Sequence, residues 1–339
     1  MLVLPNNFYK QNELKNFMKV SEHLKRAERP LLSFEITPPE RGGDINKDLR
    51  VVEKLQKYGP SFIHVTSRAA DVEEQQQPGG LVKKIIRRKR PGTLGLCYRI
   101  KSEYELDSPM HILCKGFTKE ETEDLLIDLE YGGLMNIFAI QGDERGEKPI
   151  PVGRTTNKYA SELVSQIKRM SEDFCVGVAG YPEKHGAAPT FKKDLMYLKQ
   201  KVDEGADYII TQMFFDNEKY FKFVEMCRRA RIQVPIIPGI TAIVSKNQTE
   251  GLNGLPRRFD LWLPETLDGK IDEAENNKEV RKIGIDWATN QAQELIEQKV
   301  PGVHFFIYAN SKSIIEVMEN LNLRKSSSQI IGGCGNQSY

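Results

Sequence analysis

The sequence predicts an α/β protein built as one (β/α)8 barrel, the TIM barrel fold. Short apolar runs rich in Val, Ile and Phe recur along the 339 residues, with helical patterns between them. Most runs start roughly 25 to 50 residues apart, enough for a strand, a helix and a right-handed parallel connection. Eight such units favour a closed barrel. A doubly wound open sheet is the alternative, but no Gly-x-Gly-x-x-Gly turn follows the first run.

The eight expected strands are short and apolar, and turn residues bound them. They begin near Leu31, Ser61, Met110, Asn136, Cys175, Tyr208, Pro235 and Val303. The first strand is unusual because it carries one acid, Glu35, before two prolines stop it. Burying a carboxylate is expensive unless it has partners or a catalytic task. A salt-bridged acid at a strand end and a working acid therefore both remain open from this segment alone.

Two helices between the strands have clear boundaries. The sequence Thr118-Lys-Glu-Glu121 is a capping box that opens a helix through Tyr131, and two glycines close it. A second helix is predicted from about Phe191 to Glu204, where Gly205 ends it. Its core-facing stripe comprises Leu195, Leu198 and Val202, and a polar stripe one position over comprises Asp194, Tyr197 and Lys201. The basic run from Lys83 to Arg90 is interpreted as a solvated helix end before Pro91.

Composition narrows the classes of function. With 49 Lys and Arg against 47 Asp and Glu, bulk charge gives no reason to expect a nucleic-acid or membrane-surface partner. No apolar stretch approaches the roughly 20 residues that span a bilayer, and the N-terminus lacks the basic flank of a signal peptide. The five cysteines are scattered without a Cys-x-x-Cys pair, which is typical of reduced thiols in a cytoplasmic protein.

The expected organisation has three parts. An N-terminal helical segment covers 1–30, the catalytic barrel covers 31–324, and the Ser- and Gly-rich composition of 325–339 predicts a disordered tail.

Polar residues gather where the predicted strands end, and barrel active sites lie at the C-terminal ends of the strands. The candidates are Glu35, Thr66-Ser67-Arg68, His111, Gln141-Gly142-Asp143, Tyr181 to His185, and Thr211-Gln212. Each has an ordinary alternative: Asp143 fits a plain turn, and His111 fits a satisfied core histidine. Gln212, among apolar neighbours, is harder to explain without a partner, because buried amides need hydrogen bonds.

Several kinds of chemistry find no support in the sequence. The five histidines have no paired ligand spacing and none lies beside an acid cluster, so no metal site is expected. No serine elbow or Cys–His signature suggests nucleophilic catalysis. An acid, an amide, aromatic residues and scattered hydrogen-bonding groups suit a large organic cofactor that carries the chemistry itself.

Six ordered motifs between about Leu31 and Leu321 resemble those of the methylenetetrahydrofolate reductase family, flavin-containing (β/α)8 enzymes. Ser33-Phe-Glu-Ile-Thr-Pro-Pro39 is similar to the family's Ser-Phe-Glu-Phe-x-Pro-Pro, and Thr211-Gln-Met-Phe-Phe-Asp216 to Thr-Gln-Phe-Phe-Phe-Asp. The other four are Pro109-Met-His-Ile-Leu-Cys114, Gln141-Gly-Asp143, Tyr181-Pro-Glu-Lys-His185 and Pro238-Gly239-Ile240.

The resemblance implies a reaction and a set of ligands. NADH or NADPH would reduce bound FAD, leave, and be replaced by 5,10-methylenetetrahydrofolate, which becomes 5-methyltetrahydrofolate in one-carbon and methionine metabolism. It also allows a homo-oligomer, while the choice between NADH and NADPH stays open.

The resemblance also implies a role for each matching residue. Glu35 would be the general acid, Asp143 would tune the electrostatics of flavin and folate, and Gln212 and Gln248 would bind the folate. FAD would lie along Thr66, His111, Gly142, Asp143, Tyr159, Ala160, Tyr181, His185, Ala188, Asp194 and Lys201. A general acid needs a raised pKa near neutral pH, and apolar Phe34 and Ile36 beside Glu35 are expected to raise it. Asp194 and Lys201 on one helix face offer hydrogen bonds and a cation to an adenosine diphosphate group.

Four positions depart from the family pattern. Gln141 replaces an arginine, Ser67 a tyrosine, Asn310 a folate-binding arginine, and Leu252 an aromatic residue that is often found there. Two alternatives to the reductase therefore remain. One is a catalytically silent barrel that binds folate or flavin as a subunit or binding module. The other is a flavoenzyme with a different electron acceptor.

Overall fold

Eight parallel strands close into a barrel in the part of the chain that the computed structural model describes, residues 18–142, 150, 152–250, 254–307 and 311–322. Around the barrel the strands follow the order β1-β10-β9-β8-β7-β6-β5-β2. Their bounds are Leu31–Ile36 (β1), Phe62–Val65 (β2), Met110–Leu113 (β5), Asn136–Ile140 (β6), Cys175–Gly180 (β7), Tyr208–Met213 (β8), Ile236–Ile240 (β9) and Gly302–Phe306 (β10). The predicted (β/α)8 fold is confirmed, and each strand starts within one residue of its expected position.

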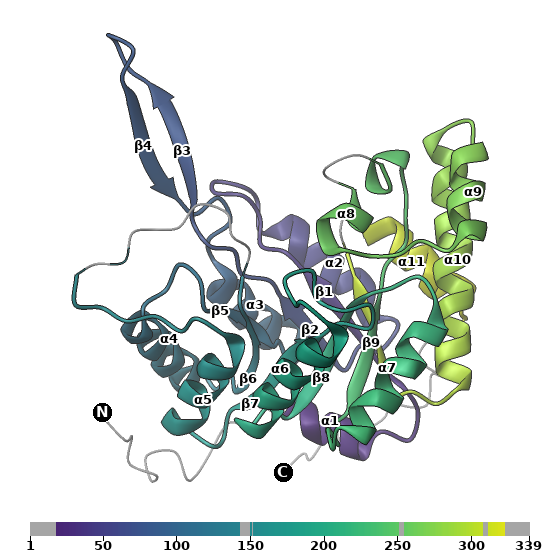
Figure 1. Cartoon of the computed structure of the whole chain (residues 1–339), viewed down its shortest axis with the longest axis horizontal. Coiled ribbons are helices and arrows are strands. Elements are labelled where there is room, and N and C mark those ends of the chain that lie inside the picture. The colour runs from purple at the N-terminus through teal and green to yellow at the C-terminus, as the bar shows by residue number, and fades with distance from the viewer. Residues whose placement is uncertain (1–17, 143–149, 151, 251–253, 308–310, 323–339) are drawn as a thin grey trace, which may run out of the picture.

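Helices surround the barrel (Figure 1). Those that follow strands cover its outer face because each parallel connection must return along the sheet to the next strand. Their bounds are Val20–Arg26 (α1), Asn46–Gln56 (α2), Thr93–Tyr104 (α3), Lys119–Tyr131 (α4), Ala160–Met170 (α5), Phe191–Asp203 (α6), Asn217–Arg229 (α7), Leu255–Phe259 (α8), Glu265–Glu273 (α9), Asn277–Glu297 (α10) and Ser311–Asn320 (α11), with a 3-10 turn at Lys246–Gln248.

The barrel wall separates two packed layers. Successive side chains along a strand point to opposite faces, so each strand contributes to both layers. Phe34 of β1 stacks on Phe305 of β10 at 5.6 Å between ring centroids, in the apolar layer between barrel and helices. Phe138 and Tyr208 instead pack in the barrel interior, with ring centroids 6.3 Å apart. Positions next to one another in sequence can therefore have unlike surroundings.

Both helices with predicted boundaries are confirmed. The Thr118 Oγ1 accepts a hydrogen bond from the Glu121 N–H at 3.1 Å, and the Glu121 carboxylate accepts one from the Thr118 N–H at 2.8 Å. This capping box starts α4, which ends at Tyr131. Helix α6 runs from Phe191 to Asp203, one residue short of the predicted end.

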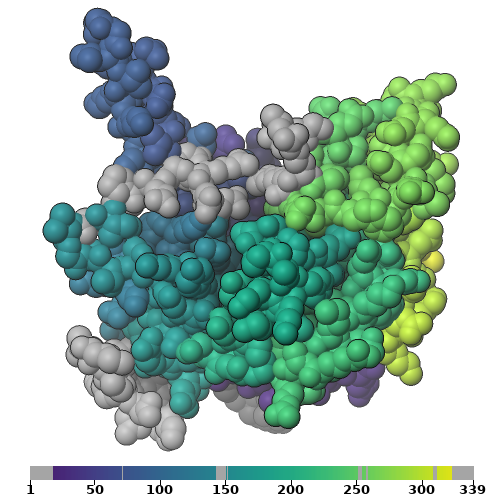
Figure 2. Space-filling model, viewed as in Figure 1, coloured from purple at the N-terminus to yellow at the C-terminus, as the bar shows by residue number. Residues whose placement is uncertain are grey.

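The basic run from Lys83 to Arg90 is not a helix end, so that interpretation is wrong. Its first part belongs to β4 (Val82–Arg87), which pairs antiparallel with β3 (Asp71–Gln76). Figures 1 and 2 show this two-stranded hairpin standing away from the barrel. Two glycines with φ of +82° and +75°, Gly79 and Gly80, form the turn. This Gly-Gly pair is the sequence signal that indicates a hairpin. Strand β4 also contains β-branched residues that favour extended backbone.

Helix α1 closes the base of the barrel, the end at which the strands begin. Val20 is fully buried, and its N–H donates to the Asn136 Oδ1 at 2.9 Å. His23 contacts Asp107 at 2.7 Å between Nε2 and Oδ2. Helix α1 lies inside the N-terminal segment expected over 1–30, whereas 1–17 and the tail expected over 325–339 fall outside the described residues. None of the described helices is long and apolar enough to cross a membrane.

Candidate active site

Glu35 lies on the inner face of β1 near the mouth of the barrel, the end at which the strands finish. Its side chain is 16% exposed, so only a small part of it meets solvent. The Glu35 Oε2 lies 3.4 Å from the His111 Nε2 and 3.8 Å from the His304 Nε2. These two rings come from β5 and β10, so closure of the barrel brings together an acid and two bases that are far apart in sequence.

A third histidine completes the cluster. The His64 Nδ1 lies 3.2 Å from the His111 Nε2, and the His304 Nδ1 lies 2.9 Å from the Ser33 Oγ. The rings of His64 and His304 pack edge to face at 5.0 Å between centroids. We call Glu35, His64, His111 and His304 the acid–histidine cluster.

Sequence spacing gave no sign of this cluster, because the proximity of Glu35 to His111 and His304 depends on barrel closure. Strand register brings these residues together. Glu35 is opposite His64, and Ser33 is opposite His304, so inward-facing positions of adjacent strands meet. Within the described residues, no group of three or more His, Cys, Asp or Glu side chains could hold a metal ion.

The pKa of Glu35 is lowered, contrary to the sequence expectation. Burial raises the pKa of Glu35, but His111, His304 and Arg68 together lower it by more. The expected effect of Phe34 and Ile36 is missing because neighbouring residues on a strand face opposite ways. Both lie in the outer apolar layer, whereas Glu35 faces polar rings. In this structure the carboxylate is therefore ionised at neutral pH.

His64 and His111, which contact each other, are both uncharged at neutral pH. Burial lowers the pKa of His111 to about 4, although Glu35 opposes that change. Burial also lowers the pKa of His64 well below its ordinary value, and the other two rings lower it further. A neutral ring has one N–H donor and one acceptor nitrogen, so the neutral His111 ring can either donate to or accept from the group at Glu35.

A second group of predicted residues meets where β7 leads into α6. The Asp194 Oδ2 accepts a hydrogen bond from the His185 N–H at 3.0 Å, and the rings of Tyr181 and His185 pack at 4.6 Å. The Lys201 Nζ donates to the carbonyl of Ala179 and lies 5.9 Å from the centre of the Tyr181 ring. Burial lowers the pKa of Lys201 to about 8, and Asp194 opposes the change.

The predicted residues on β2, β5 and β6 lie on the same side of the barrel as this group. The Thr66 Oγ1 donates to the Thr37 Oγ1 at 3.1 Å. Gly142 adopts a positive φ of +88°, which favours glycine and turns the chain at the end of β6. Tyr159 and Ala160 stand at the start of α5, Tyr159 as the N-cap residue with 61% of its surface exposed, and Ala188 is buried.

The two glutamines predicted to bind folate lie elsewhere around the barrel, one on β8 and one in the 3-10 turn after β9. The Gln212 Oε1 accepts a hydrogen bond from the Met213 N–H at 3.0 Å, at the end of β8. The Gln248 Oε1 accepts one from the Val244 N–H at 2.6 Å, after β9. In both side chains the oxygen is bound to backbone. Asp143, Leu252 and Asn310 lie outside the described residues, so their surroundings stay predictions.

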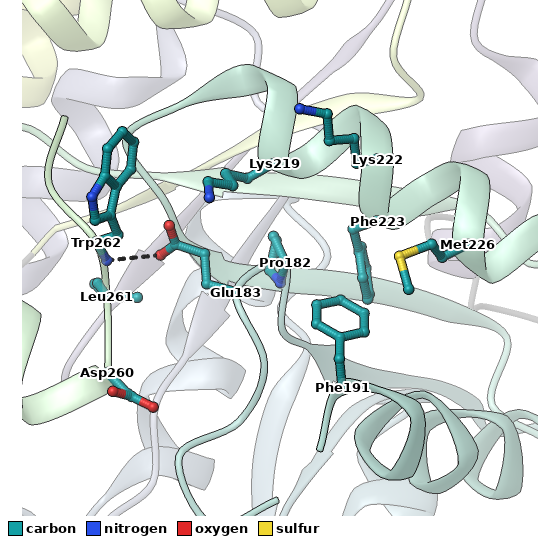
Figure 3. Close-up of a pocket in the computed structure, with 10 residues that line it drawn as sticks. All are labelled: Pro182, Glu183, Phe191, Lys219, Lys222, Phe223, Met226, Asp260, Leu261 and Trp262. Carbon is teal, nitrogen blue, oxygen red and sulfur yellow. Dashed lines mark hydrogen bonds between the residues drawn. The ribbon is translucent and has the colours of Figure 1, made fainter. Parts of the chain in front are cut away.

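A cavity of about 530 Å³ lies away from the acid–histidine cluster, between the β7–α6 loop, α6, α7 and the segment after α8 (Figure 3). Glu183 forms one wall, and its Oε2 accepts a hydrogen bond from the Trp262 N–H at 3.2 Å. The Lys219 Nζ lies 4.9 Å from the centre of the Trp262 ring. Because its lining includes none of the cluster residues, we do not assign the reaction to this cavity.

Comparisons with known proteins identify relatives over most of the chain. A family model described as methylenetetrahydrofolate reductase matches residues 19–322. Methylenetetrahydrofolate reductase 1 of Schizosaccharomyces pombe is 27% identical over 317 residues, which cover 90% of this chain and 49% of that protein. The 5,10-methylenetetrahydrofolate reductase of Escherichia coli is 31% identical over 296 residues, which cover 86% of this chain and 91% of that protein.

The chain spans about half the length of the yeast and plant relatives, 49% and 52% in the examples from fission yeast and rice. Among solved structures, a Clostridium thermocellum protein described as binding two copies of 5-methyl-5,6,7,8-tetrahydrofolic acid superimposes with a TM-score of 0.56. It is 12% identical, and the match covers 90% of this chain and 98% of that one. Similarity at this level of identity supports the fold alone.

Proposed function

Because the chain belongs to the methylenetetrahydrofolate reductase family, we propose that it reduces 5,10-methylenetetrahydrofolate to 5-methyltetrahydrofolate, with FAD as cofactor and NADH or NADPH as electron donor. The reaction belongs to one-carbon metabolism. The observation that carries the proposal is Glu35, an acid on β1 near the mouth of a (β/α)8 barrel, within reach of His111 and His304. An acid in this position is what proton-assisted opening of a folate methylene bridge requires.

The residues at the mouth of the barrel fit FAD by the chemistry that they offer. The partly buried Lys201 ammonium provides a cation for a diphosphate, and Thr66 and His185 provide hydrogen-bonding groups. The amides at the start of α5, near Tyr159 and Ala160, add donors for an anion. His111, Gly142, Tyr181, Ala188 and Asp194 complete the proposed set. When bound, FAD would supply reversible hydride transfer between the nicotinamide and the folate.

Glu35 would act on the folate rather than on the flavin. It would hold a proton at Oε2 and give it to an amine nitrogen of the methylene bridge, which opens the bridge to an iminium. A ligand over the exposed part of Glu35 removes water from the carboxylate, and this loss raises its pKa toward the working pH. His111 and His304 would keep the proton close, since both ring Nε2 atoms lie within 4 Å of the carboxylate.

The remaining residues would orient the substrate. The side-chain oxygens of Gln212 and Gln248 each accept a hydrogen bond from a backbone N–H. This bond fixes the orientation of each amide, so its NH2 group must donate to a different partner. We propose that these NH2 groups donate hydrogen bonds to the folate. By resemblance alone, Asp143 would adjust the electrostatics of flavin and folate.

The visible spectrum of the purified protein under nitrogen tests the proposal. We expect a flavin band that bleaches when NADH or NADPH is added and returns when methylenetetrahydrofolate follows. Colourless protein that takes up no added FAD would contradict the reductase. Saturable methylenetetrahydrofolate binding without reoxidation of the flavin would favour the silent binding module. Rapid reoxidation by another acceptor, and not by the folate, would favour a different flavoenzyme.

A further inference from the structure

Arg88 stands at the foot of the hairpin, directly after β4, and is held in place by three contacts. Its Nε donates to the carbonyl oxygen of Arg68 at 3.3 Å, and its Nη2 donates to the Ser67 Oγ at 3.2 Å. Its guanidinium carbon lies 5.0 Å from the centre of the Phe117 ring, in the loop between β5 and α4. The contacts come from two separate segments at the mouth of the barrel, so the guanidinium is fixed in one orientation before any ligand arrives.

All three of these partners are neutral. No carboxylate of the described residues lies within 4.0 Å of the Arg88 guanidinium, whereas Arg90 nearby pairs with Glu40 at 2.9 Å. Burial lowers the pKa of Arg88 and the neighbouring Arg41 lowers it further, while Glu121 opposes the change. A half-buried cation without an acidic partner is unfavourable, and an anionic ligand would relieve it. Among the described residues the Nη1 of Arg88 has no hydrogen-bond partner, so one edge of the fork is available.

The side chain of Arg88 contacts residues that follow β2 and β5, while its backbone carbonyl accepts from Arg41 in the loop after β1. The proposed flavin residues come from β2, β5, β6 and β7, which are adjacent in the barrel, whereas the proposed folate residues come from β1, β8 and the loop after β9. Arg88 contacts Ser67 and Arg68, the two residues that follow Thr66 at the end of β2, so it lies on the flavin side. On that side, Gln141 carries no charge and donates its amide to the Lys158 carbonyl at 3.3 Å.

We propose that Arg88 binds a phosphate group of the flavin dinucleotide, and that the hairpin foot thereby forms part of the cofactor site. This inference rests on the proposed function, because it takes the flavin side of the barrel from it. Arginine suits the task because its planar fork can hold Ser67 and Arg68 on one edge and a phosphate on the other. A lysine has its three donors on one nitrogen and lacks the planar fork that places donors on two edges.

Flavin binding to flavin-stripped protein, followed by fluorescence, tests the proposal. For Arg88→Gln we expect the Kd for FAD to rise about tenfold, because one charge-assisted hydrogen bond is lost. The Kd for riboflavin, which has no phosphate, should stay unchanged. The Kd of Arg88→Lys for FAD should lie between those of wild type and Arg88→Gln, and it should rise with added salt. Arg87→Gln, an exposed neighbour on β4, is the matched control and should bind FAD like wild type.

Three results would overturn the inference. The first is Arg88→Gln protein that keeps its wild-type circular dichroism and its wild-type Kd for FAD. The second is an equal loss of affinity for FAD and riboflavin, which would indicate a packing role. The third is weakened binding of polyglutamyl folate with unchanged FAD binding, which would assign Arg88 to a folate carboxylate. Wild-type protein that binds no FAD would overturn the proposed function together with this inference, so the two failures are distinguishable.

Discussion

The two ends of the barrel both contain buried polar groups, but they use them differently. At the base, Asn136 accepts from the Val20 N–H at 2.9 Å and donates to the Met18 carbonyl at 3.0 Å, so both ends of its amide are satisfied. At the mouth, Glu35 meets His111 and His304 at 3.4 and 3.8 Å, longer than ordinary hydrogen bonds. The base holds α1 against the barrel, whereas the mouth keeps polar groups loosely paired and able to respond to a ligand.

The acid–histidine cluster also contains buried ring nitrogens without a hydrogen-bond partner in the described part of the chain. Among the described residues, the Nε2 atoms of His64 and His304 are buried without a hydrogen-bond partner. Leaving such an atom unpaired costs about 1–3 kcal/mol. Such atoms also occur outside the acid–histidine cluster, for example the Tyr208 hydroxyl at the start of β8, so the contrast between the two ends rests on the paired contacts of α1 and the long contacts of Glu35. We therefore expect changes at the base to affect stability without affecting the reaction, and four variants compare the two ends.

The largest effect is expected from Glu35→Gln at the mouth. We expect the folate half-reaction to slow by roughly 100- to 10,000-fold, because a general acid is lost. Flavin reduction by NADH or NADPH should keep its wild-type rate, and the melting temperature should change little. Stopped-flow absorbance of the two half-reactions measures both rates. A variant that reduces the folate at the wild-type rate would show that Glu35 is not the acid.

Low pH should destabilise the folded protein because it protonates buried histidines of the acid–histidine cluster. The folded barrel lowers the pKa of His111 from 6.5 to about 4 and lowers that of His64 as well. Between those values the unfolded chain binds protons that the folded chain does not. The free energy of unfolding should therefore fall as the pH falls from 6.5 toward 4, by at most about 1.4 kcal/mol per pH unit for each histidine.

His64→Phe checks this pH dependence, because a phenyl ring fits the aromatic surroundings and cannot titrate. Urea unfolding at several pH values should give a shallower slope for the variant than for wild type. Parallel slopes would exclude His64 as a source of the acid sensitivity.

Asn136→Ala at the base should cost stability without affecting the reaction. The substitution removes two hydrogen bonds and leaves the Val20 N–H unpaired, so we expect a loss of about 2 kcal/mol in the free energy of unfolding. Asn136→Asp keeps the acceptor for Val20 but buries a carboxylate against the Met18 carbonyl oxygen, so it should lose at least as much. Urea titration gives the free energies, and rates measured on folded protein should match wild type. A slow but fully stable Asn136→Ala protein would contradict the separation of the two ends.

The smallest effect is expected from Thr118→Ala, which removes the capping box of α4. This helix starts at the mouth of the barrel, so the variant tests whether every change at the mouth affects the reaction. We expect a loss of about 1 kcal/mol in unfolding free energy with unchanged kinetics. Thr118→Ser keeps the hydroxyl and serves as the control. Altered rates in Thr118→Ala alone would mean that α4 positions part of the site.

Local patterns in the chain determined much of this protein. Apolar runs, helix caps and glycines gave eight strands, the fold class, and the bounds of α4 and α6, because these features depend on neighbouring residues. The motifs around Glu35 and His111 also singled out two members of the acid–histidine cluster. The hairpin was missed because its strands carry many charges and lack an apolar face, although Gly79 and Gly80 marked its turn.

Only the tertiary structure decided the environment of the site. His64 and His304 are separated by most of the chain, and closure of the barrel puts their rings 5.0 Å apart. It also reversed the expected direction of the Glu35 pKa shift, because strand alternation turns Phe34 and Ile36 away from the carboxylate. A pKa depends on which groups lie close together in space. Strand register and barrel closure determine those contacts, and no local pattern in the sequence specifies either of them.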